Sequence, residues 1–418
     1  MKFDTALREH VRQRILEFTP ADIVVGIPAY NNEQTIAHVV KTVAEGLQTY
    51  YPDRTALLFI SDGGSLDYTR EVAEAIEVTK PVYKVVSIYR GVPGKGTSLR
   101  AIFEAAERLE AKACAVFDSD LRSITPAWIA ALLQPVLEQG YDFVSPYYHR
   151  HKWDATITNN IARALTQALY GKRIRQPIGG DFGFSSGLVK WFAQADVWET
   201  DVARFGIDIW MTTVAICEGF SVCEAMLGAK IHDPKDPGAA LGPMFRQVVG
   251  TLFSLMARYD AIWRRVHGSQ SVPLLGEVRC DEPPPVKVSI ERLLNNYGHG
   301  FRHFGALWRE VLAPDQYCVL ERLASADEAD FHMAPQDWAR IVYDFAYTYH
   351  RWSRDKYKLV ELMTPIYYGR VASFVLTSRD MTTAQADELI EEQARIFEEQ
   401  KPYLIDRMAA WEEPLPGI

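Results

Sequence analysis

Two carboxylates stand where an apolar run ends, in the segment ACAVFDSDL at 113–121. Asp118 and Asp120 are one residue apart, at the point where a strand-like stretch would leave the core. Carboxylates at this spacing can share a divalent cation, and Mg²⁺ usually takes one or two protein carboxylates together with phosphate oxygens. An Asp-x-Asp at a surface turn is the alternative, and the pair alone does not decide between them.

A lysine lies in a second segment that could bind phosphate, the glycine-rich GVPGKGTS at 91–98. Lys95 is followed by Gly96 rather than directly by Ser or Thr, so the spacing is wrong for an ATP-hydrolysing P-loop. A glycine-rich turn that opens a helix can still offer backbone N–H groups to a phosphate, and the lysine would add a positive charge. A solvated loop lysine is the alternative.

Two carboxylates and a histidine occupy unusual settings farther along the chain. Asp181 lies in the loop-like QPIGGDFGFSS at 176–186, and Asp208 lies between two isoleucines near a predicted helix start. The helix dipole favours a carboxylate there, and contact with a sugar or an acceptor is the other explanation for Asp208. His232 ends a strand-like run and is either structural or a metal ligand that joins Asp120.

The remaining histidines of interest form two short clusters. His149 and His151 flank Arg150 and precede Lys152, so these residues form either an anion-binding cluster or a solvated basic turn. The segment GHGFRH at 298–303 holds two histidines, but no carboxylate or cysteine stands near them in the sequence, and we interpret them as structural.

Strand-like and helix-like segments must position these residues, and they alternate through the first 150 residues. Short apolar runs predict strands at 23–27, 57–60, 82–89, 113–117 and 143–145, with helices between them. This alternation predicts an α/β fold with a mostly parallel, Rossmann-like sheet and helices on both faces. Ligands of such sheets bind beyond the carboxyl ends of the strands. Tyr30, Asp62, Lys95 and the Asp118–Asp120 pair all follow strands, so we expect them to converge at one edge.

The composition excludes several classes of function. The 418 residues carry a formal net charge of -9, whereas nucleic-acid binding requires a clustered basic surface, so we expect no nucleic-acid partner. The 5 cysteines are scattered without a CxxC pair, which gives no support for zinc or disulfides and suits a cytoplasmic protein. The polar N-terminus does not read as a signal peptide, and no run of about 18 apolar residues predicts a membrane span.

Seven motifs in a fixed order resemble a known family. PAYNNE, SDGGS, GKG, DSDL, PIGGDFG, FGIDI and KIHDP occur in this order over about 20–260. Together they resemble the GT-A glycosyltransferases that make glucosyl-3-phosphoglycerate, mannosyl-3-phosphoglycerate and glucosylglycerate. The resemblance implies retaining, Mg²⁺- or Mn²⁺-dependent transfer of glucose or mannose from a nucleoside-diphosphate sugar to the 2-hydroxyl of D-glycerate or 3-phosphoglycerate. UDP-glucose, GDP-glucose, ADP-glucose and GDP-mannose all stay open as donors.

The resemblance also assigns roles to residues. The expected nucleotide-sugar-binding residues are Pro28, Ala29, Tyr30, Glu33, Asp62, Gly63, Lys95, Asp118, Ser119, Gly179 and Lys230. Asp120 and His232 are the expected metal ligands. Asp208 and Asp181 take positions that can be Glu in relatives and are the catalytic candidates. Retaining transfer requires no strong side-chain base, because the leaving phosphate oxygen can take the acceptor's proton.

The acceptor segment departs from the family pattern. Phosphoglycerate-using relatives carry an Arg-x-Thr element where this chain reads DATITN at 154–159. Losing a guanidinium that grips phosphate bidentately favours a less charged acceptor such as free glycerate. Arg150, Lys152 or Arg163 could substitute for it. The residues expected to bind the acceptor are Arg150, Thr156, Thr158 and Asn159.

The resemblance and the composition together divide the chain. We expect an N-terminal helix at 1–20, a GT-A catalytic domain at 21–266, a proline-rich linker at 267–287 and a helical C-terminal domain at 288–418. The nucleotide-sugar half of the catalytic domain is expected at 21–150 and the acceptor half at 151–266. Aromatic stripes in the C-terminal helices are core or subunit contacts, so we expect a homodimer.

Two rival functions share the nucleotide-binding half. An inverting transferase that loads polyprenyl phosphate or a polysaccharide would need a carboxylate base opposite the donor. A sugar-nucleotide sensor or scaffold would bind the donor without chemistry. The anomeric configuration of the product separates the two transferases, and metal-dependent donor hydrolysis separates an enzyme from a scaffold.

Overall fold

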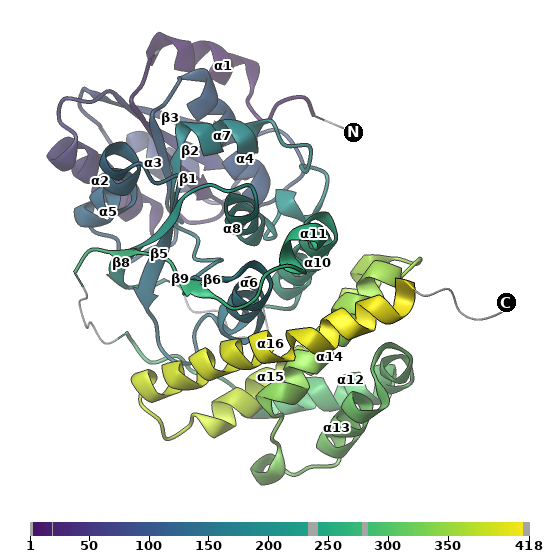
Figure 1. Cartoon of the computed structure of the whole chain (residues 1–418). Coiled ribbons are helices and arrows are strands. Elements are labelled where there is room, and N and C mark those ends of the chain that lie inside the picture. Colours follow the sequence, from purple (N-terminus) through teal and green to yellow (C-terminus); the bar gives the residue numbers. More distant parts are fainter. Residues whose placement is uncertain (1–2, 19, 233–240, 278–282, 413–418) are drawn as a thin grey trace. The chain divides into compact units, whose positions relative to one another are not determined.

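The computed structural model describes residues 3–18, 20–232, 241–277 and 283–412 (Figure 1). The chain forms two compact units, each made of three segments. The sheet unit comprises Met1–His149, Ile174–Asp233 and Val272–Pro284, and the helical unit comprises Arg150–Arg173, Pro234–Ser271 and Pro285–Ile418. Compact units need not coincide with functional domains, so the domain boundaries given above stay a prediction.

An eight-stranded sheet forms the centre of the sheet unit. Its strands are β1 (Ile23–Ala29), β2 (Ala56–Asp62), β3 (Val82–Ile88), β4 (Ala113–Val116), β5 (Phe143–His149), β7 (Phe182–Ser185), β8 (Val222–Ala229) and β10 (Leu274–Leu275). Their order across the sheet is β10-β8-β5-β7-β4-β1-β2-β3. All neighbours pair in parallel except β7, which is antiparallel to β4 and β5. The predicted mostly parallel α/β sheet is confirmed.

Helices cover both faces of this sheet because its central strands are apolar on both sides. The helical elements of the sheet unit are α1 (Glu9–Ile15), η1 (Leu16–Phe18), α2 (Ile36–Tyr50), α3 (Thr69–Ala75), α4 (Lys95–Arg108), α5 (Pro126–Gln139), α7 (Ser186–Ala193), η3 (Asp201–Ala203) and α8 (Ile207–Cys217). α2 and α5 pack with the strands in one apolar cluster, and α4 and α7 lie on the opposite face (Figure 1). The predicted N-terminal helix is shorter than 1–20, since α1 begins at Glu9.

Strands form in two segments where the sequence indicated irregular structure. The glycine-rich segment 176–186 contains β7, whose alternating Phe182 and Phe184 are fully buried. Gly183 lies so close to its neighbours that a Cβ there would meet the carbonyl oxygen of Leu132 at 2.2 Å. The loop prediction was therefore wrong for 182–185. Gly183 is needed for close packing within the strand and does not mark a loop. The predicted linker 267–287 likewise contributes β10, which pairs with β8.

The helical unit consists almost entirely of helices. Its elements are η2 (Thr158–Ala162), α6 (Arg163–Tyr170), β6 (Lys172–Arg173), α10 (Gly242–Arg258), α11 (Asp260–Trp263), β9 (Gln270–Ser271), α12 (Ile290–Val311), α13 (Pro314–Ala324), η4 (Glu328–Asp330), α14 (Pro335–Arg351), α15 (Lys356–Thr377) and α16 (Thr383–Glu412). The predicted helical C-terminal region is confirmed. Buried tryptophans anchor it, since Trp308 donates to the carbonyl of Leu362 at 2.9 Å and Trp338 to that of Asn160 at 2.6 Å.

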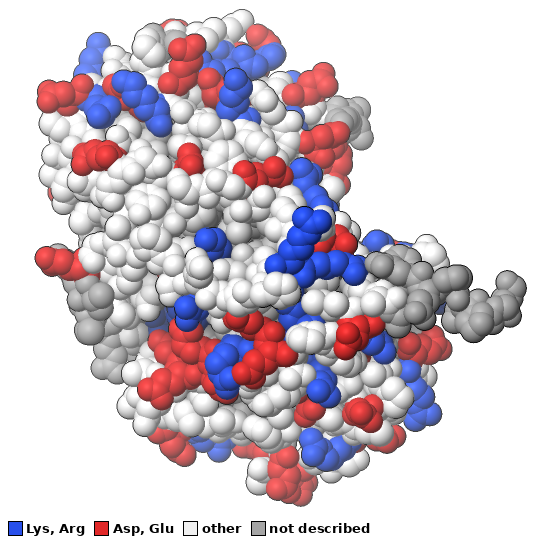
Figure 2. All heavy atoms as spheres, in the orientation of Figure 1, with Lys and Arg blue, Asp and Glu red and all other residues white. Residues whose placement is uncertain are grey.

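Neither unit offers a helix that could cross a membrane, within the part of the chain that the structure describes. On the face shown in Figure 2, a broad area is uncharged, and acidic and basic side chains lie close to one another over much of the rest.

Candidate active site

The carboxyl ends of the parallel strands bring together charged residues that are far apart in the sequence. Asp118 follows β4 and Lys230 follows β8, while Lys95 and Asp208 lie in the first turns of α4 and α8. Asp181 directly precedes β7, which runs antiparallel and therefore starts at this same edge. The predicted convergence at one sheet edge is confirmed for Lys95 and Asp118, whereas Lys230, Asp181 and Asp208 were not part of that prediction.

Lys95 bridges two carboxylates. Its Nζ lies 2.9 Å from Oδ1 of Asp118 and 3.1 Å from Oδ2 of Asp208. All three side chains are largely buried, but none is sealed, since 11–23% of each stays exposed. The other carboxylate oxygen of Asp208, Oδ1, has no hydrogen-bond partner among the described residues. This oxygen is buried, so the described part of the protein leaves its capacity to accept a hydrogen bond unused.

Lys230 forms the second half of the charged network. Its Nζ lies 2.9 Å from Oδ2 of Asp118 and 2.9 Å from Oδ2 of Asp181, and it donates to the carbonyl of Gly179 at 2.9 Å. The ammonium group also lies 5.0 Å from the centre of the Tyr148 ring, within cation–π range. Its side chain is only 3% exposed, so its partners hold it in place.

Asp181 is wholly buried and ties the network to the backbone. Oδ1 accepts the N–H of Asp118 at 2.7 Å, and Oδ2 accepts from Lys230 and from the hydroxyl of Tyr148. Its side chain has no exposed surface. These contacts suit a residue that positions Asp118 and Lys230, and its predicted catalytic role stays a prediction.

The network shifts the pKa values of its members. Burial disfavours the charged form of Asp118, but Lys230 and Lys95 hold the pKa of Asp118 well below its usual range. Burial would also lower the pKa of Lys95, whereas Asp118 and Asp208 raise it above its ordinary value. Burial raises the pKa of Asp208, and Lys95 offsets only part of that shift. The edge thus holds a firmly ionised Asp118 beside a carboxyl that protonates more readily.

A β-bulge and a glycine shape this edge. The register of β5 and β8 shifts after the pair Tyr147–Met226, so that Tyr148 lies opposite Gly228 rather than Leu227. An extra residue in one strand changes which face the following side chains take, and these include Lys230. Gly180 has φ +93, and a Cβ there would meet Oδ2 of Asp118 at 2.1 Å.

The glycines around Lys95 serve close packing. A Cβ on Gly96 would meet the carbonyl oxygen of Val202 at 1.8 Å, and its N–H donates to the carbonyl of Arg204 at 3.2 Å. Gly94 has φ +155 and lies against the same segment. The GKG motif therefore locks the start of α4 against residues 202–204, which directs Lys95 toward Asp118. The N–H of Gly96 is therefore not one of the backbone donors that this turn could offer to a phosphate.

The loops after β1 and β2 are joined by side-chain hydrogen bonds. Asn32 Oδ1 accepts from the N–H of Tyr30 at 3.0 Å and from the hydroxyl of Ser119 at 2.7 Å, which links the first loop to the DSD turn. Asp62 is fully buried, and its oxygens accept from Gly64 and Ser65 within its own turn. The carboxylate of Asp62 therefore shapes the loop and is not open to a nucleotide.

The other residues predicted to bind the nucleotide-sugar lie on these loops. Gly63 donates its N–H to the carbonyl of Ala29 at 2.8 Å. Ala29 is the last residue of β1 and follows Pro28. Glu33 accepts from the N–H of Tyr68 at 3.1 Å. Tyr30 is 57% exposed, so it can contact a ligand. Binding of a nucleotide-sugar by these residues stays a prediction.

The two predicted metal ligands lie on neighbouring segments. Arg122 donates its N–H to the carbonyl of Ile231 at 2.9 Å, and Ile231 donates to the hydroxyl of Ser123 at 2.9 Å, so the chain after Asp120 runs beside His232. The Asp120 carboxylate makes no hydrogen bond or ion pair with a described residue. Among the described residues, no group of three or more His, Cys, Asp or Glu could hold a metal. One carboxylate and one imidazole fit a cation that takes its other ligands from a diphosphate.

The predicted acceptor residues lie in the helical unit. Thr156 shares a 2.6 Å hydrogen bond with the hydroxyl of Tyr367, and Asn159 donates to the carbonyl of Asp154 at 3.0 Å. Thr158 is buried in η2. Arg150 lies 3.3 Å from the Asp154 carboxylate. Their role toward an acceptor stays a prediction.

The basic cluster at 149–152 is not a solvated turn. Lys152 is buried and donates to the carbonyls of Ser378 at 2.6 Å and Arg379 at 2.9 Å. It therefore caps the carboxyl end of α15 within the helical unit, where these carbonyl groups lack helical partners.

Sequence reasoning missed several residues of the site. Tyr148, Asn32 and Gly180 each contact a predicted site residue directly. A strand prediction that extended past 145 would have placed Tyr148 at the sheet edge. The doubled glycine at 179–180 was a signal for a close backbone approach.

Residues 24–199 match the family described as Glycosyl transferase family 2. This match confirms the prediction of a glycosyltransferase with a GT-A nucleotide-binding fold. It includes Lys95, Asp118 and Asp181 and ends before Asp208, Lys230 and His232. No curated protein matches the chain.

Similar solved structures include several of glucosyl-3-phosphoglycerate synthase from Mycobacterium tuberculosis. A complex with Mn²⁺, uridine diphosphate and glucosyl-3-phosphoglycerate is 24% identical over 62% of this chain and 87% of its own, with a TM-score of 0.47. A complex with Mn²⁺, UDP-glucose and phosphoglyceric acid is 24% identical over 61% and 85%, with a TM-score of 0.46. A complex with Mn²⁺, UDP-glucose and glycerol 3-phosphate is 23% identical over 62% and 87%, with a TM-score of 0.45.

Proposed function

We propose that this chain is a retaining hexosyltransferase that moves glucose or mannose from a nucleoside-diphosphate sugar to D-glycerate or 3-phosphoglycerate. The observation that carries the proposal is the buried network in which Lys95 and Lys230 clamp the two oxygens of Asp118. This network lies at the carboxyl ends of parallel strands, where sheets of this type bind ligands. The ordered motifs given above support the choice of acceptor.

Two lysines and one free carboxylate oxygen suit transfer from a diphosphate leaving group. Lys95 and Lys230 stabilise negative charge that develops on the departing diphosphate, and their fixed positions require little rearrangement. Oδ1 of Asp208 accepts a hydroxyl of the sugar or the acceptor, while Oδ2 keeps Lys95 in place. In retaining transfer the leaving phosphate oxygen receives the acceptor's proton, so Asp208 orients rather than deprotonates.

Asp120 and His232 would hold the divalent cation. An oxygen and an imidazole ligand leave most of an octahedral shell to phosphate oxygens and water, which suits Mg²⁺ or Mn²⁺. The cation would act as a Lewis acid on the diphosphate. The cytoplasmic location, the homodimer and the choice of donor base stay predictions.

A donor-by-acceptor grid tests the proposal. UDP-, GDP- and ADP-glucose and GDP-mannose are each combined with glycerate and 3-phosphoglycerate, and NMR assigns the anomer of the product. We expect one donor to give a product of unchanged anomeric configuration. Product of inverted configuration, or no turnover and no donor hydrolysis with any pair, would refute the proposal in favour of an inverting transferase or a scaffold.

The Asp120→Ala variant tests the metal role, with Asp53→Ala as the matched control. Asp53 is exposed in the loop before β2, at the opposite end of that strand from the site. We expect Asp120→Ala to abolish metal-dependent transfer and to keep the wild-type circular dichroism spectrum, and Asp53→Ala to match wild type in both. Wild-type turnover by Asp120→Ala at saturating Mg²⁺ or Mn²⁺ contradicts metal ligation by this residue.

A further inference from the structure

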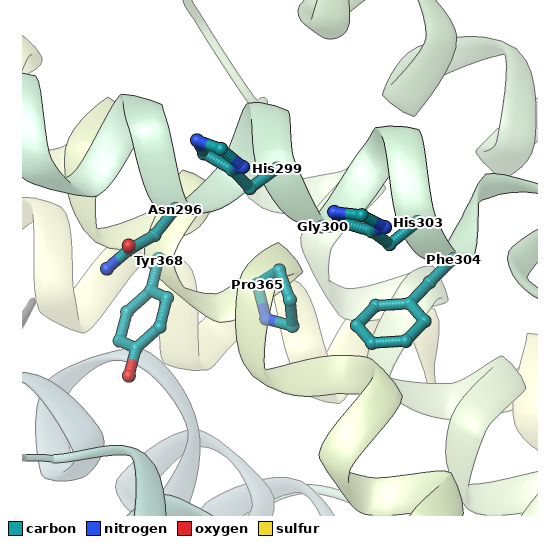
Figure 3. Close-up of a pocket in the computed structure, with 7 residues that line it drawn as sticks. All are labelled: Asn296, His299, Gly300, His303, Phe304, Pro365 and Tyr368. Atoms are coloured by element: carbon teal, nitrogen blue, oxygen red, sulfur yellow. The ribbon is translucent and has the colours of Figure 1, made fainter.

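Two histidines lie one helical turn apart on an exposed face of α12 (Figure 3). The ring centres of His299 and His303 are 6.4 Å apart, their planes differ by 15°, and both rings point the same way in Figure 3. Both side chains are exposed, and neither makes a hydrogen bond or ion pair with a described residue. The sequence predicted a structural role for these histidines, because no carboxylate or cysteine stands near them. Without a hydrogen bond or ion pair to a described residue, neither ring fills that role through a polar contact.

The opposite face of α12 is fixed against the rest of the helical unit. Tyr297 donates to the carbonyl of Leu320 at 2.6 Å, and Trp308 donates to that of Leu362 at 2.9 Å. At Gly300 the helix lies directly on α15, where an added Cβ would meet Cβ of Pro365 at 2.2 Å. These contacts prevent rotation of α12, so the two imidazoles are held on the outer face.

A cavity of about 390 Å³ lies beside the two rings. Asn296, Gly300 and Phe304 of α12 line it together with Pro365 and Tyr368 of α15. Figure 3 shows the ring of Pro365 beneath the helix, between Tyr368 and Phe304. The cavity is large enough for several water molecules or a small ligand next to the imidazoles.

We propose that His299 and His303 chelate a divalent transition-metal ion such as Zn²⁺ or Ni²⁺. Imidazole nitrogens suit these ions. Two histidines four residues apart lie on one face of a helix, and helices present zinc-binding pairs at this spacing. Because both rings are exposed, rotation about their side-chain bonds can bring one nitrogen of each onto a common ion. Water or a small ligand in the cavity completes the coordination.

This site differs in chemistry from the one proposed at Asp120 and His232. No third His, Cys, Asp or Glu joins the pair among the described residues, so the protein supplies two nitrogen ligands and no carboxylate. Mg²⁺ prefers oxygen ligands and leaves such a pair empty. An ion that bridges successive turns of α12 binds the folded state and therefore stabilises it.

Titration of the full chain with Ni²⁺ in the presence of excess Mg²⁺ tests the proposal, with calorimetry and the thermal midpoint as readouts. We expect saturable Ni²⁺ binding that raises the midpoint. His299→Ala and His303→Ala should each weaken it by about tenfold or more, because even the loss of an outer-shell partner costs 10–100-fold in metal affinity. Neither change removes a contact of the fold, so both variants should stay folded.

His332→Ala is the matched control, since His332 is an exposed histidine of the helical unit outside this pair. It should bind Ni²⁺ as the wild type does. Wild-type affinity in His303→Ala would overturn the proposal, as would equal losses in His332→Ala and His303→Ala. Binding that survives in His299→Ala and His303→Ala and disappears in Asp120→Ala would assign the ion to the candidate active site and overturn the proposal as well.

Discussion

Gly180 allows a direct test of the charged network at the sheet edge. Its backbone has φ +93, and a Cβ would lie 2.1 Å from Oδ2 of Asp118 and 3.1 Å from Nζ of Lys230. The first distance is more than an ångström short of ordinary contact, which begins at 3.4 Å. Gly180→Ala must therefore displace the Asp118 carboxylate from Lys230.

The size of the effect follows from the contact that is lost. The 2.9 Å bond between Lys230 and Asp118 joins two charged groups, and such a bond contributes about 1.5–3 kcal/mol. If the transition state loses that amount, kcat/KM falls about 10- to 100-fold, because about 1.4 kcal/mol corresponds to a tenfold change in rate. The positive φ adds about 1–2 kcal/mol of destabilisation for any residue other than glycine.

Gly219→Ala separates the two contributions. Gly219 also has a positive φ, +81, but a Cβ there meets nothing within 4 Å. We expect the positive φ to cost both variants a similar part of the free energy of unfolding in urea. Gly180→Ala should lose more in total because the contact between Asp118 and Lys230 is also displaced, and only Gly180→Ala should lose activity. If kcat/KM of Gly180→Ala stays within about threefold of that of Gly219→Ala, a difference below about 0.7 kcal/mol, the network does not contribute to transfer as proposed.

Three further substitutions probe the same network. Lys230 and Lys95 lower the pKa of Asp118 despite its burial. The stability that Asp118 contributes is therefore present above its unfolded pKa of about 3.9 and is lost as the pH falls through the folded value. Asp118→Asn should therefore flatten the acid limb of the urea-unfolding free energy, and an unchanged limb would contradict the ion pairs. Burial raises the pKa of Asp208, so its ionised form costs stability as the pH rises from about 3.9 through the folded value. The unfolding free energy of Asp208→Asn minus that of wild type should therefore be larger at pH 7 than at pH 4. The opposite order in urea melts would show that pairing with Lys95 outweighs burial. Asp181→Asn leaves Lys230 and the Tyr148 hydroxyl short of an acceptor and should cost about 3 kcal/mol in urea unfolding, whereas a loss below about 1 kcal/mol would mean that these contacts are replaceable.

The elements that local patterns describe well were predicted, and those that depend on neighbours were not. The strand before Asp118 was predicted because its apolar run ends sharply at a carboxylate. β5 extends to His149, whereas the predicted strand ended at 145, directly before Pro146. β7 pairs only with Phe143 and Val144, so beyond them one side of β5 needs no backbone donor and tolerates proline.

The sequence by itself determined which side chains stand at the sheet edge. Apolar runs define the strands, parallel strands share one direction, and Lys95 and Asp118 follow them at the same end. The tertiary structure alone decided which of these charges pair. Lys230 is separated from Asp118 by 112 residues, and Lys95 from Asp208 by 113. Their contacts depend on strand order, on the bulge in β8 and on glycines that admit close approach, because a side chain's partner is set by the packing of distant elements and not by its local sequence.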